Sequence, residues 1–216
     1  RGDGGELELF GEAFAPSGPL EAAARGVAII HQELCLSPDL SVEQNIVLGR
    51  EPRARGLVDR SRQRALAASA LARLASELDP RALVRSLGPG ERQIVEIARA
   101  LAFDARVLIL DEPTSSLTRV EVERLFDVLR SLRADGRSIL YVSHFLEEVE
   151  EIADRYTVLR DGRSVASGSM SETTPAQLVE AMAGRRLDEV YPPRRESPSG
   201  DAEVALRVRS IRGQDL

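Results

Sequence analysis

The stretch RVLILDEPTSSLT, residues 106–118, decides the fold of this chain. Val107 to Leu110 are apolar without alternation, which is typical of a strand covered on both faces in a parallel sheet. Asp111 and Glu112 follow at its carboxyl end, where open α/β sheets bind their ligands. Two adjacent carboxylates are costly to desolvate, so a cation or a proton-transfer role would explain them. A strand that merely ends in polar turn residues is the simpler alternative.

Two other short apolar runs also end in polar side chains. Val27 to Ile30 leads to Gln32, and Ser138 to Val142 leads to His144, with helical patterns between the runs. Alternating strands and helices imply right-handed parallel crossovers, which bring the carboxyl ends of the strands to one edge of a sheet. The sequence therefore predicts an α/β fold in which the polar ends of the three strands converge.

These groups suit phosphoanhydride hydrolysis. Asp111 can hold Mg²⁺ through water, and Glu112 can orient or deprotonate the attacking water. Gln32 could contact the metal and the water, and His144 could donate a hydrogen bond to the γ-phosphate. Each residue alone is more often structural, so the hypothesis depends on the combination.

Residues 34–87 have a helical character, with an amphipathic helix expected from Ser61 to Leu78. Gly88-Pro89-Gly90 follows and precedes another run of helical spacing. The turn therefore marks a helix N-terminus, whose N–H groups and dipole can bind a phosphate, although most such turns are only turns. A capping box from Thr118 to Glu121 begins a further helix.

Turn signals organise the rest of the chain. Asp161-Gly162 predicts a hairpin, and Pro175 to Met182 predicts a short helix that ends at Gly184. Tyr191 to Ala202 is rich in Pro, Arg, Ser and Gly, which indicates a linker, and the alternation from Ala205 to Ile211 indicates another strand.

Composition limits the classes of function. The net charge of −6 and the pI of about 5.2 offer no general attraction for a nucleic-acid backbone, so no nucleic-acid partner is expected. The single cysteine, Cys35, favours a reducing cytoplasm. No uncharged apolar run approaches the roughly 18 residues of a spanning helix, so a membrane would be reached only through a partner. All 29 basic residues are arginine, so a G-x-x-x-x-G-K-[ST] phosphate loop is absent from these residues. With no initiating Met, we expect a fragment.

Together these segments resemble the nucleotide-binding domain of ATP-binding cassette (ABC) transporters. The matching segments are Gln32 for the Q-loop, Leu87 to Gln93 (LGPGERQ) for the signature motif, Val107 to Glu112 for the Walker B strand, Ser115 to Thr118 for the D-loop, and His144 for the switch histidine. The resemblance implies a P-loop NTPase-like core with a parallel sheet and an inserted helical subdomain at about residues 34–87. It also implies ATP and Mg²⁺ as cofactors.

In this family two cassettes meet head to tail and hold two ATP molecules between them. The resemblance then implies that Glu112, His144 and Gln32 serve catalysis at one site, and that Asp111 with Gln32 binds the metal. The residues implied to contact the opposing nucleotide are Gly88, Gly90, Glu91, Gln93 and Ser116.

Finer likeness is to the two-cassette ATPases of bacterial monosaccharide importers. It is carried by VAIIHQELCLSPDLSVEQNIVLGRE (27–51), by AMAGRRLDEVYP (181–192) and by Thr118 in place of a common aspartate. This likeness implies a first cassette at residues 1–191, a linker at 192–203 and the start of a second cassette at 204–216. The implied partners are that second cassette in the same polypeptide, transmembrane permease subunits and, indirectly, an external sugar-binding protein. The implied location is the cytoplasmic face of the cell membrane.

Two departures from the family pattern matter. Gly88 replaces the usual signature serine, which removes one hydrogen bond to phosphate worth about 1.5–3 kcal/mol. A required positive φ is one possible reason for that glycine. The Walker A loop and the adenine-stacking aromatic residue would lie before Arg1, so the fragment alone should bind and hydrolyse ATP poorly. A non-catalytic structural cassette and a non-transport cassette protein, such as a translation or repair factor, are the alternatives.

Overall fold

The computed structural model describes residues 4–184, which form two compact units divided after Tyr156. Each unit is described by itself. The predicted linker at 192–203 and the predicted second cassette at 204–216 lie outside the described residues, as does the end of the predicted first cassette.

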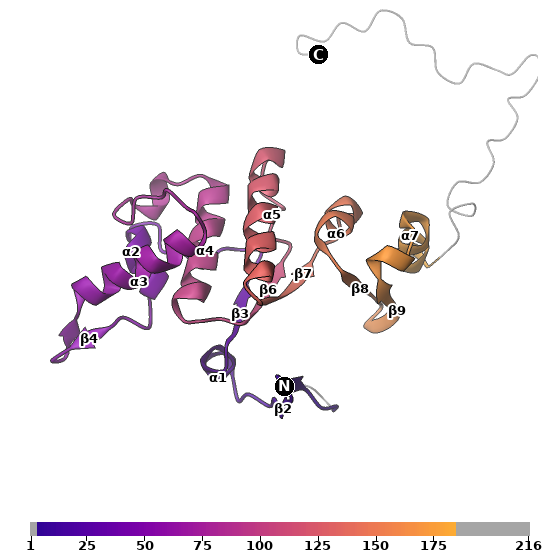
Figure 1. Cartoon of the computed structure of the whole chain (residues 1–216), viewed down its shortest axis with the longest axis horizontal. Coiled ribbons are helices and arrows are strands. Elements are labelled where there is room, and N and C mark those ends of the chain that lie inside the picture. The colour runs from indigo at the N-terminus through magenta and orange to yellow at the C-terminus, as the bar shows by residue number, and fades with distance from the viewer. Residues whose placement is uncertain (1–3, 185–216) are drawn as a thin grey trace, which may run out of the picture. The chain divides into compact units, whose positions relative to one another are not determined.

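Unit 1 is built on a three-stranded parallel sheet in the order β3–β6–β7 (Figure 1). The strands are β3 (Val27–Ile30), β6 (Val107–Asp111) and β7 (Ser138–Val142). The predicted strands are confirmed, and so are the parallel crossovers. The register places Ile30 beside Leu110 and Leu110 beside Tyr141, so the three strands end at the same edge.

The described residues cover one face of the sheet more completely than the other. Ile30, Leu108 and Leu110 are buried on the face that packs into the core with α4 and α5. On the opposite face Ile29 is 48% exposed and Leu140 is 56% exposed. In β6 itself, Leu108 and Leu110 are buried and Val107 and Ile109 are half-buried, so the expectation of a strand covered on both faces is met on one face and only partly on the other within residues 4–184.

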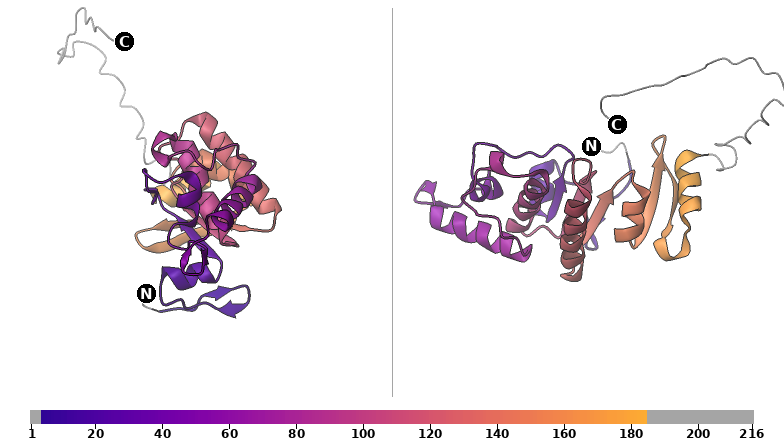
Figure 2. Two further views of the ribbon diagram at one scale, coloured as in Figure 1. Left: turned by 90° about the vertical axis from the view of Figure 1, so that its left-hand side faces the viewer. Right: turned by 90° about the horizontal axis from the view of Figure 1, so that it is seen from above.

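A helical layer lies beside the sheet in unit 1 (Figure 2). It consists of α2 (Val42–Val47), α3 (Arg60–Arg73) and α4 (Pro89–Ala102), which pack on one another. The predicted helical character of residues 34–87 is present in α2 and α3, but this stretch also contains a small hairpin of β4 (Arg53–Ala54) and β5 (Leu57–Val58), and α4 lies beyond it.

Helix α3 ends earlier than the sequence predicts. Ala75 adopts a φ of 47°, and the N–H of Ser76 donates to the carbonyl of Leu71 at 3.1 Å. This bond closes a Schellman motif, which normally has glycine at the left-handed position. The prediction of a helix extending to Leu78 is wrong. The helix ends at the Schellman motif, which no glycine marks in the sequence, before it reaches the expected stop at Asp79-Pro80.

The remaining elements of unit 1 follow local signals. Thr118 caps α5 (Arg119–Ala134) through the predicted box, in which the Thr118 N–H donates to Glu121 Oε2 at 2.8 Å. Gly136, at φ 80°, follows the helix. The other elements are β1 (Glu8–Leu9), β2 (Glu12–Ala13), α1 (Pro19–Ala24), η1 (Val84–Ser86) and α6 (Leu146–Ile152).

Unit 2 begins within β8 (Arg155–Arg160), which pairs with β9 (Arg163–Ser169). The predicted Asp161-Gly162 turn is confirmed, with both residues at positive φ, as a type I′ hairpin requires. A single turn, η2 (Met170–Glu172), leads to α7 (Pro175–Ala183), which ends at a left-handed Gly184. Across residues 4–184 the structure has no helix that is long and apolar enough to span a bilayer.

Candidate functional site

The carboxyl edge of the β3–β6–β7 sheet carries the polar residues that the sequence pointed out. Asp111 is the last residue of β6 and pairs with Val142 at the end of β7. Glu112 and His144 follow these two residues by one and two positions, and Gln32 follows β3 by two. The predicted convergence of the strand ends is confirmed.

Glu112 and His144 are in direct contact. Nδ1 of His144 lies 3.0 Å from Oε1 of Glu112. The Glu112 side chain is 30% exposed and the His144 side chain is 58% exposed, so both remain accessible from the sheet edge. With Glu112 ionised, Nδ1 carries the proton and donates to the carboxylate.

The backbone at Glu112 is held in an uncommon conformation. Its φ is 45°, although the residue is not glycine, and its N–H donates to the carbonyl of Val142 at 2.9 Å. A non-glycine residue in this region costs roughly 1–3 kcal/mol, and such residues cluster at functional sites. The hydrogen bond to β7 anchors the backbone of Glu112 at the sheet edge.

Asp111 and Gln32 flank this pair as uncommitted polar groups. Asp111 is half-buried and Gln32 is exposed. Within residues 4–184 neither side chain makes a hydrogen bond or an ion pair. Oxygen ligands for a hard cation are therefore present at this edge.

The predicted signature segment starts helix α4. Gly88 is the N-cap residue, and its N–H donates to Glu91 Oε2 at 2.9 Å. The N–H of Gly90 donates to Glu121 Oε1 at 3.0 Å, which joins α4 to the start of α5. The N–H and the hydroxyl of Thr118, followed by the N–H of Gly90, hold the pKa of Glu121 below its usual value of 4.5.

The two glycines of this segment have different surroundings. Gly88 has a φ of −70°, so the positive φ considered as a reason for glycine is not found. A Cβ added at Gly88 would lie 3.8 Å from Glu91 Oε2, which is an ordinary contact. A Cβ at Gly90 would lie 2.8 Å from Glu121 Oε1 and 2.9 Å from its Cγ. Packing therefore requires glycine at position 90 but not at position 88.

The other predicted nucleotide ligands differ in accessibility. Glu91 and Ser116 are exposed. Gln93 is buried at 4% exposure, and its Nε2 has no hydrogen-bond partner within the described residues. The structure thus places Gln93 on the inner side of α4, away from the open helix start.

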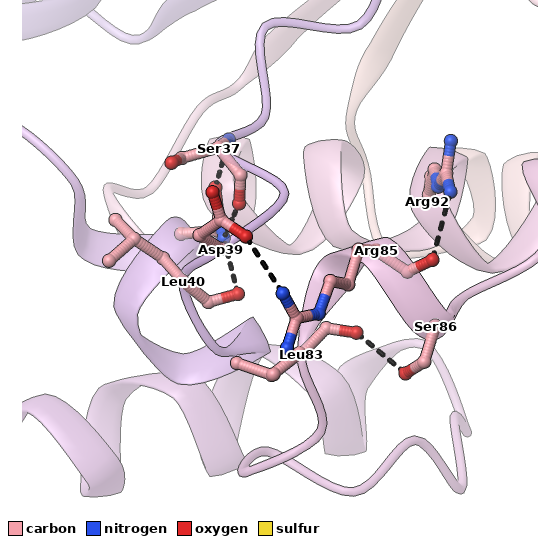
Figure 3. A network of polar contacts seen from close by, with 8 residues as sticks. Ser37, Asp39, Leu40, Leu83, Arg85, Ser86 and Arg92 are labelled. Carbon is pink, nitrogen blue, oxygen red and sulfur yellow. Dashed lines mark hydrogen bonds and ion pairs between the residues drawn. The ribbon is translucent and has the colours of Figure 1, made fainter.

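A polar network fixes the approach to α4 (Figure 3). Arg85 Nη1 donates to Asp39 Oδ1 at 3.1 Å, and Arg92 Nη2 donates to the carbonyl of Arg85 at 3.4 Å. The N–H groups of Val84 and Arg85 donate to the carbonyls of Leu40 and Pro38. The segment after Gln32 is therefore hydrogen-bonded along the segment that precedes Gly88.

Asn45, at 0% exposure, supports the same network from α2. Its Oδ1 accepts the N–H of Ser37, and its Nδ2 donates to the carbonyls of Ser37, Leu40 and Ser41. Sequence reasoning missed this residue. The capping box of Ser41 and Gln44, which lies beside it, was a readable signal for an ordered turn here.

Sequence reasoning also missed Glu148 on α6. Its Oε2 accepts hydrogen bonds from the hydroxyls of Thr114, Tyr141 and Ser143. No local sequence signal marks this residue, because none of its three partners lies on α6.

This chain is similar to known ATP-binding proteins in sequence and in fold. A family model described as ABC transporter matches residues 1–115. A putative ribose/galactose/methyl galactoside import ATP-binding protein of Ralstonia nicotianae is 44% identical over 98% of this chain and 41% of its own length. The ribose import ATP-binding protein RbsA 3 of Rubrobacter xylanophilus is 47% identical over 98% of this chain and 42% of its own length. The chain therefore spans about 40% of the length of these relatives.

Solved structures show the same fold. A nucleotide-free ATP-binding cassette from an ABC transporter superposes with a TM-score of 0.69 at 20% identity, covering 83% of this chain and 77% of that one. The ATP-binding cassette MJ0796, in a dimeric post-hydrolysis state bound to ADP and Pi, superposes with a TM-score of 0.62 at 22% identity, covering 78% of this chain and 74% of that one. By its fold and by the family model that matches more than half of its residues, this chain belongs to the ABC transporter family.

Proposed function

We propose that this chain is part of an ATP-binding and ATP-hydrolysing cassette that drives carbohydrate import. The observation that carries the proposal is the 3.0 Å contact between Glu112 and His144, beside Asp111 at the carboxyl edge of the sheet. This arrangement joins a proton acceptor, a hydrogen-bond donor and a cation ligand within one short edge. Phosphoryl transfer to water needs these three functions.

Each side chain has a distinct role in this proposal. Glu112 orients the attacking water and accepts its proton. His144 is anchored through Nδ1 to Glu112, and as an imidazolium it also donates from Nε2 to the γ-phosphoryl oxygen. Gln32 lies at the same edge and orients the water from the other side. The fixed backbone at Glu112 supports this role because general-base catalysis depends on position before pKa.

The donor set fits Mg²⁺ bound together with a nucleotide. No group of three or more His, Cys, Asp or Glu side chains gathers as a metal site within residues 4–184. Mg²⁺ is usually held by one or two carboxylates plus phosphate oxygens and water, so the single free carboxylate of Asp111, with Gln32, suffices. Bound there, the ion would polarise the phosphoryl oxygens and neutralise the charge that develops on them.

A second nucleotide is proposed to bind at the start of α4. Gly88 and Gly90 offer N–H groups at a helix N-terminus, where anions are favoured. In the structure Glu91 and Glu121 accept these hydrogen bonds. A phosphate brought by a second cassette would replace these carboxylates as the acceptor. The exposed Ser116, two residues before the N-cap of α5, is proposed as a further contact. Gln93 would support the helix from inside.

The open face of the sheet supports a larger cassette than the described residues. Ile29, Leu140 and Val142 form an exposed apolar face, which soluble domains normally cover. We propose that a segment bearing the lysine-containing phosphate loop packs there. The proposed limits remain a first cassette over 1–191, a linker over 192–203 and a second cassette from 204.

Carbohydrate import is proposed because the relatives named above are import ATP-binding proteins for ribose and galactose. The helical layer of α2, α3 and α4 would contact a transmembrane permease, which receives its sugar from an external binding protein. The protein would then work at the cytoplasmic face of the membrane. The net charge of −6 gives no support to a nucleic-acid partner.

Reconstitution tests this function. The complete protein should copurify with a permease and, in vesicles that also contain the sugar-binding protein, hydrolyse ATP faster when ribose or galactose is added. Copurification with ribosomes, or ATPase activity that no sugar stimulates in the presence of the permease, would instead favour a non-transport protein. If transport is complete while all ATP hydrolysis occurs at the other cassette, this cassette has a structural role.

A further inference from the structure

Glu148 on α6 is a half-buried carboxylate that joins three separate segments of unit 1. We infer that Glu148 is a positioning residue, which holds the Glu112 and His144 loops at the separation needed for hydrolysis. This inference rests on the proposed ATPase function and adds to it a residue that contacts neither the nucleotide nor the metal.

One oxygen of Glu148 receives all three hydrogen bonds. The hydroxyl of Thr114 lies 2.9 Å from Oε2, that of Tyr141 lies 2.8 Å from it, and that of Ser143 lies 2.9 Å from it. Hydrogen bonds to an ionised acceptor are roughly twice as strong as neutral ones. Burial, together with the hydrogen bond to Glu148, raises the pKa of Tyr141 above its usual value of 10.0, so its hydroxyl remains a donor.

The positions of the donors relate this carboxylate to the reacting groups. Thr114 follows Glu112 by two residues, and Ser143 directly precedes His144. Tyr141 lies on the buried face of β7 and anchors the carboxylate to the sheet. Glu148 therefore joins the loop that leaves β6 to the loop that leaves β7.

A second hydrogen bond stiffens the His144 loop. The N–H of Phe145 donates to Ser143 Oγ at 3.0 Å, while the same hydroxyl donates to Glu148. The Phe145 ring lies 4.1 Å from the His144 ring between centroids. The backbone on both sides of His144 is thus fixed through Ser143, and the 3.0 Å contact of His144 with Glu112 depends on this support.

Kinetics of the complete protein test the inference. Glu148→Ala should lower kcat by about 10–100-fold, since a displacement of about 1 Å in a catalytic group has effects of this size. The KM for ATP should stay within about twofold, because ground-state nucleotide binding does not use this network. Glu148→Gln keeps an acceptor oxygen and should recover much of the rate. Glu150→Ala, an exposed site on the same helix, is the matched control and should match the parent.

A spectroscopic measurement separates positioning from a general loss of stability. Residues 1–216 contain 2 histidines, His31 and His144, and their ring ¹⁵N signals in the complete protein are assigned by replacing each of the two in turn. Glu148→Ala should shift the ring signals of His144 and leave those of His31 in place. If that variant fails to fold, Thr114→Val and Ser143→Ala decide, because each removes one donor. Both should lower kcat more than Tyr141→Phe, which leaves the two loops tied to the carboxylate.

The outcomes distinguish the two levels of the proposal. Unchanged kcat and unchanged His144 signals in a folded Glu148→Ala variant, with Glu112→Gln inactive, would overturn the positioning role alone. An unchanged kcat with a raised KM for ATP in Glu148→Ala would also overturn the positioning role. Parental turnover in Glu112→Gln would instead overturn the proposed hydrolytic function.

Discussion

A serine substitution should destabilise the protein at Gly90 and leave its stability nearly unchanged at Gly88, although the two residues are only two positions apart. At Gly88 the added Cβ meets nothing closer than 3.8 Å, and serine is a good N-cap residue. At Gly90 it would lie 2.9 Å from Glu121 Cγ. The side chain of Glu121 must move, and its hydrogen bonds to Gly90 and to Thr118 are then lost or strained.

The magnitude follows from two alternatives at position 90. If Glu121 stays, overpacking costs about 1–3 kcal/mol. If it rotates away, the lost capping interactions cost about 0.5–2 kcal/mol. Either way Gly90→Ser should lower the free energy of unfolding by about 1–2 kcal/mol, whereas Gly88→Ser should change it by less than about 0.5 kcal/mol.

Thermal unfolding followed by circular dichroism measures the difference. About 1 kcal/mol corresponds to about 2–4 °C in the unfolding midpoint for a chain of 150–250 residues. In a double-mutant cycle, Glu121→Ala should remove most of the penalty of Gly90→Ser, because the two groups are in contact. Equal midpoints for Gly88→Ser and Gly90→Ser, or an unchanged penalty in the Glu121→Ala background, would refute the packing argument.

Three further predictions concern charge and phosphate contacts. Burial raises the pKa of Glu96, which favours the neutral form in the folded protein. The stability that the neutral carboxyl group contributes is therefore lost as pH rises above about 4.5. Glu96→Gln should raise the unfolding midpoint at pH 7, and a lower midpoint would contradict this. The lowered pKa of Glu121 contributes stability that is complete above about pH 4.5 and is lost as pH falls. Between about pH 6 and pH 3 the unfolding midpoint of Glu121→Gln should therefore fall less than that of the parent. Parallel plots of midpoint against pH for the two proteins would exclude the effect. In the complete protein Gly88→Ser should preserve or raise ATPase activity, since its hydroxyl can add about 1.5–3 kcal/mol of phosphate contact, and a large loss would show that the glycine is required.

The sheet and its capped helices were predictable because their signals are local. Val107 to Leu110 form an uninterrupted apolar run, and Thr118 with Glu121 forms a capping box whose two partners are three residues apart. Strand pairing in parallel followed from the alternation of strands and helices. These features predicted the edge at which Glu112 and His144 meet.

Other features depend on contacts between distant segments. The end of α3 is set by Ala75 in a conformation that usually requires glycine, so no residue type announced it. The contact of Gly90 with Glu121 joins residues 31 positions apart, and Thr114 lies 34 positions from Glu148. Because such pairs are created by packing, the sequence pattern named the candidate reacting groups but not the residues in contact with their loops.

The residues of the predicted signature motif differ in burial. Gln93 fits the predicted signature motif by its spacing, yet its side chain lies on the buried face of α4 and is only 4% exposed. Helical spacing could have indicated this, since Ile97 lies four residues later and is also buried. The motif match therefore predicted a helix start at Gly88 without distinguishing the exposed groups of the segment from its inward-facing ones.

Replacement of Glu112 by glutamine tests the hydrolytic role most directly. In the complete protein Glu112→Gln keeps the shape of the side chain but removes the proton acceptor, so ATP should still bind with near-parental affinity. Steady-state ATPase activity should fall by about 10²–10⁴-fold, the usual contribution of a positioned general base. Glu150→Gln, at an exposed position, is the control and should hydrolyse ATP like the parent. ATPase activity of Glu112→Gln near the parental rate would contradict the account.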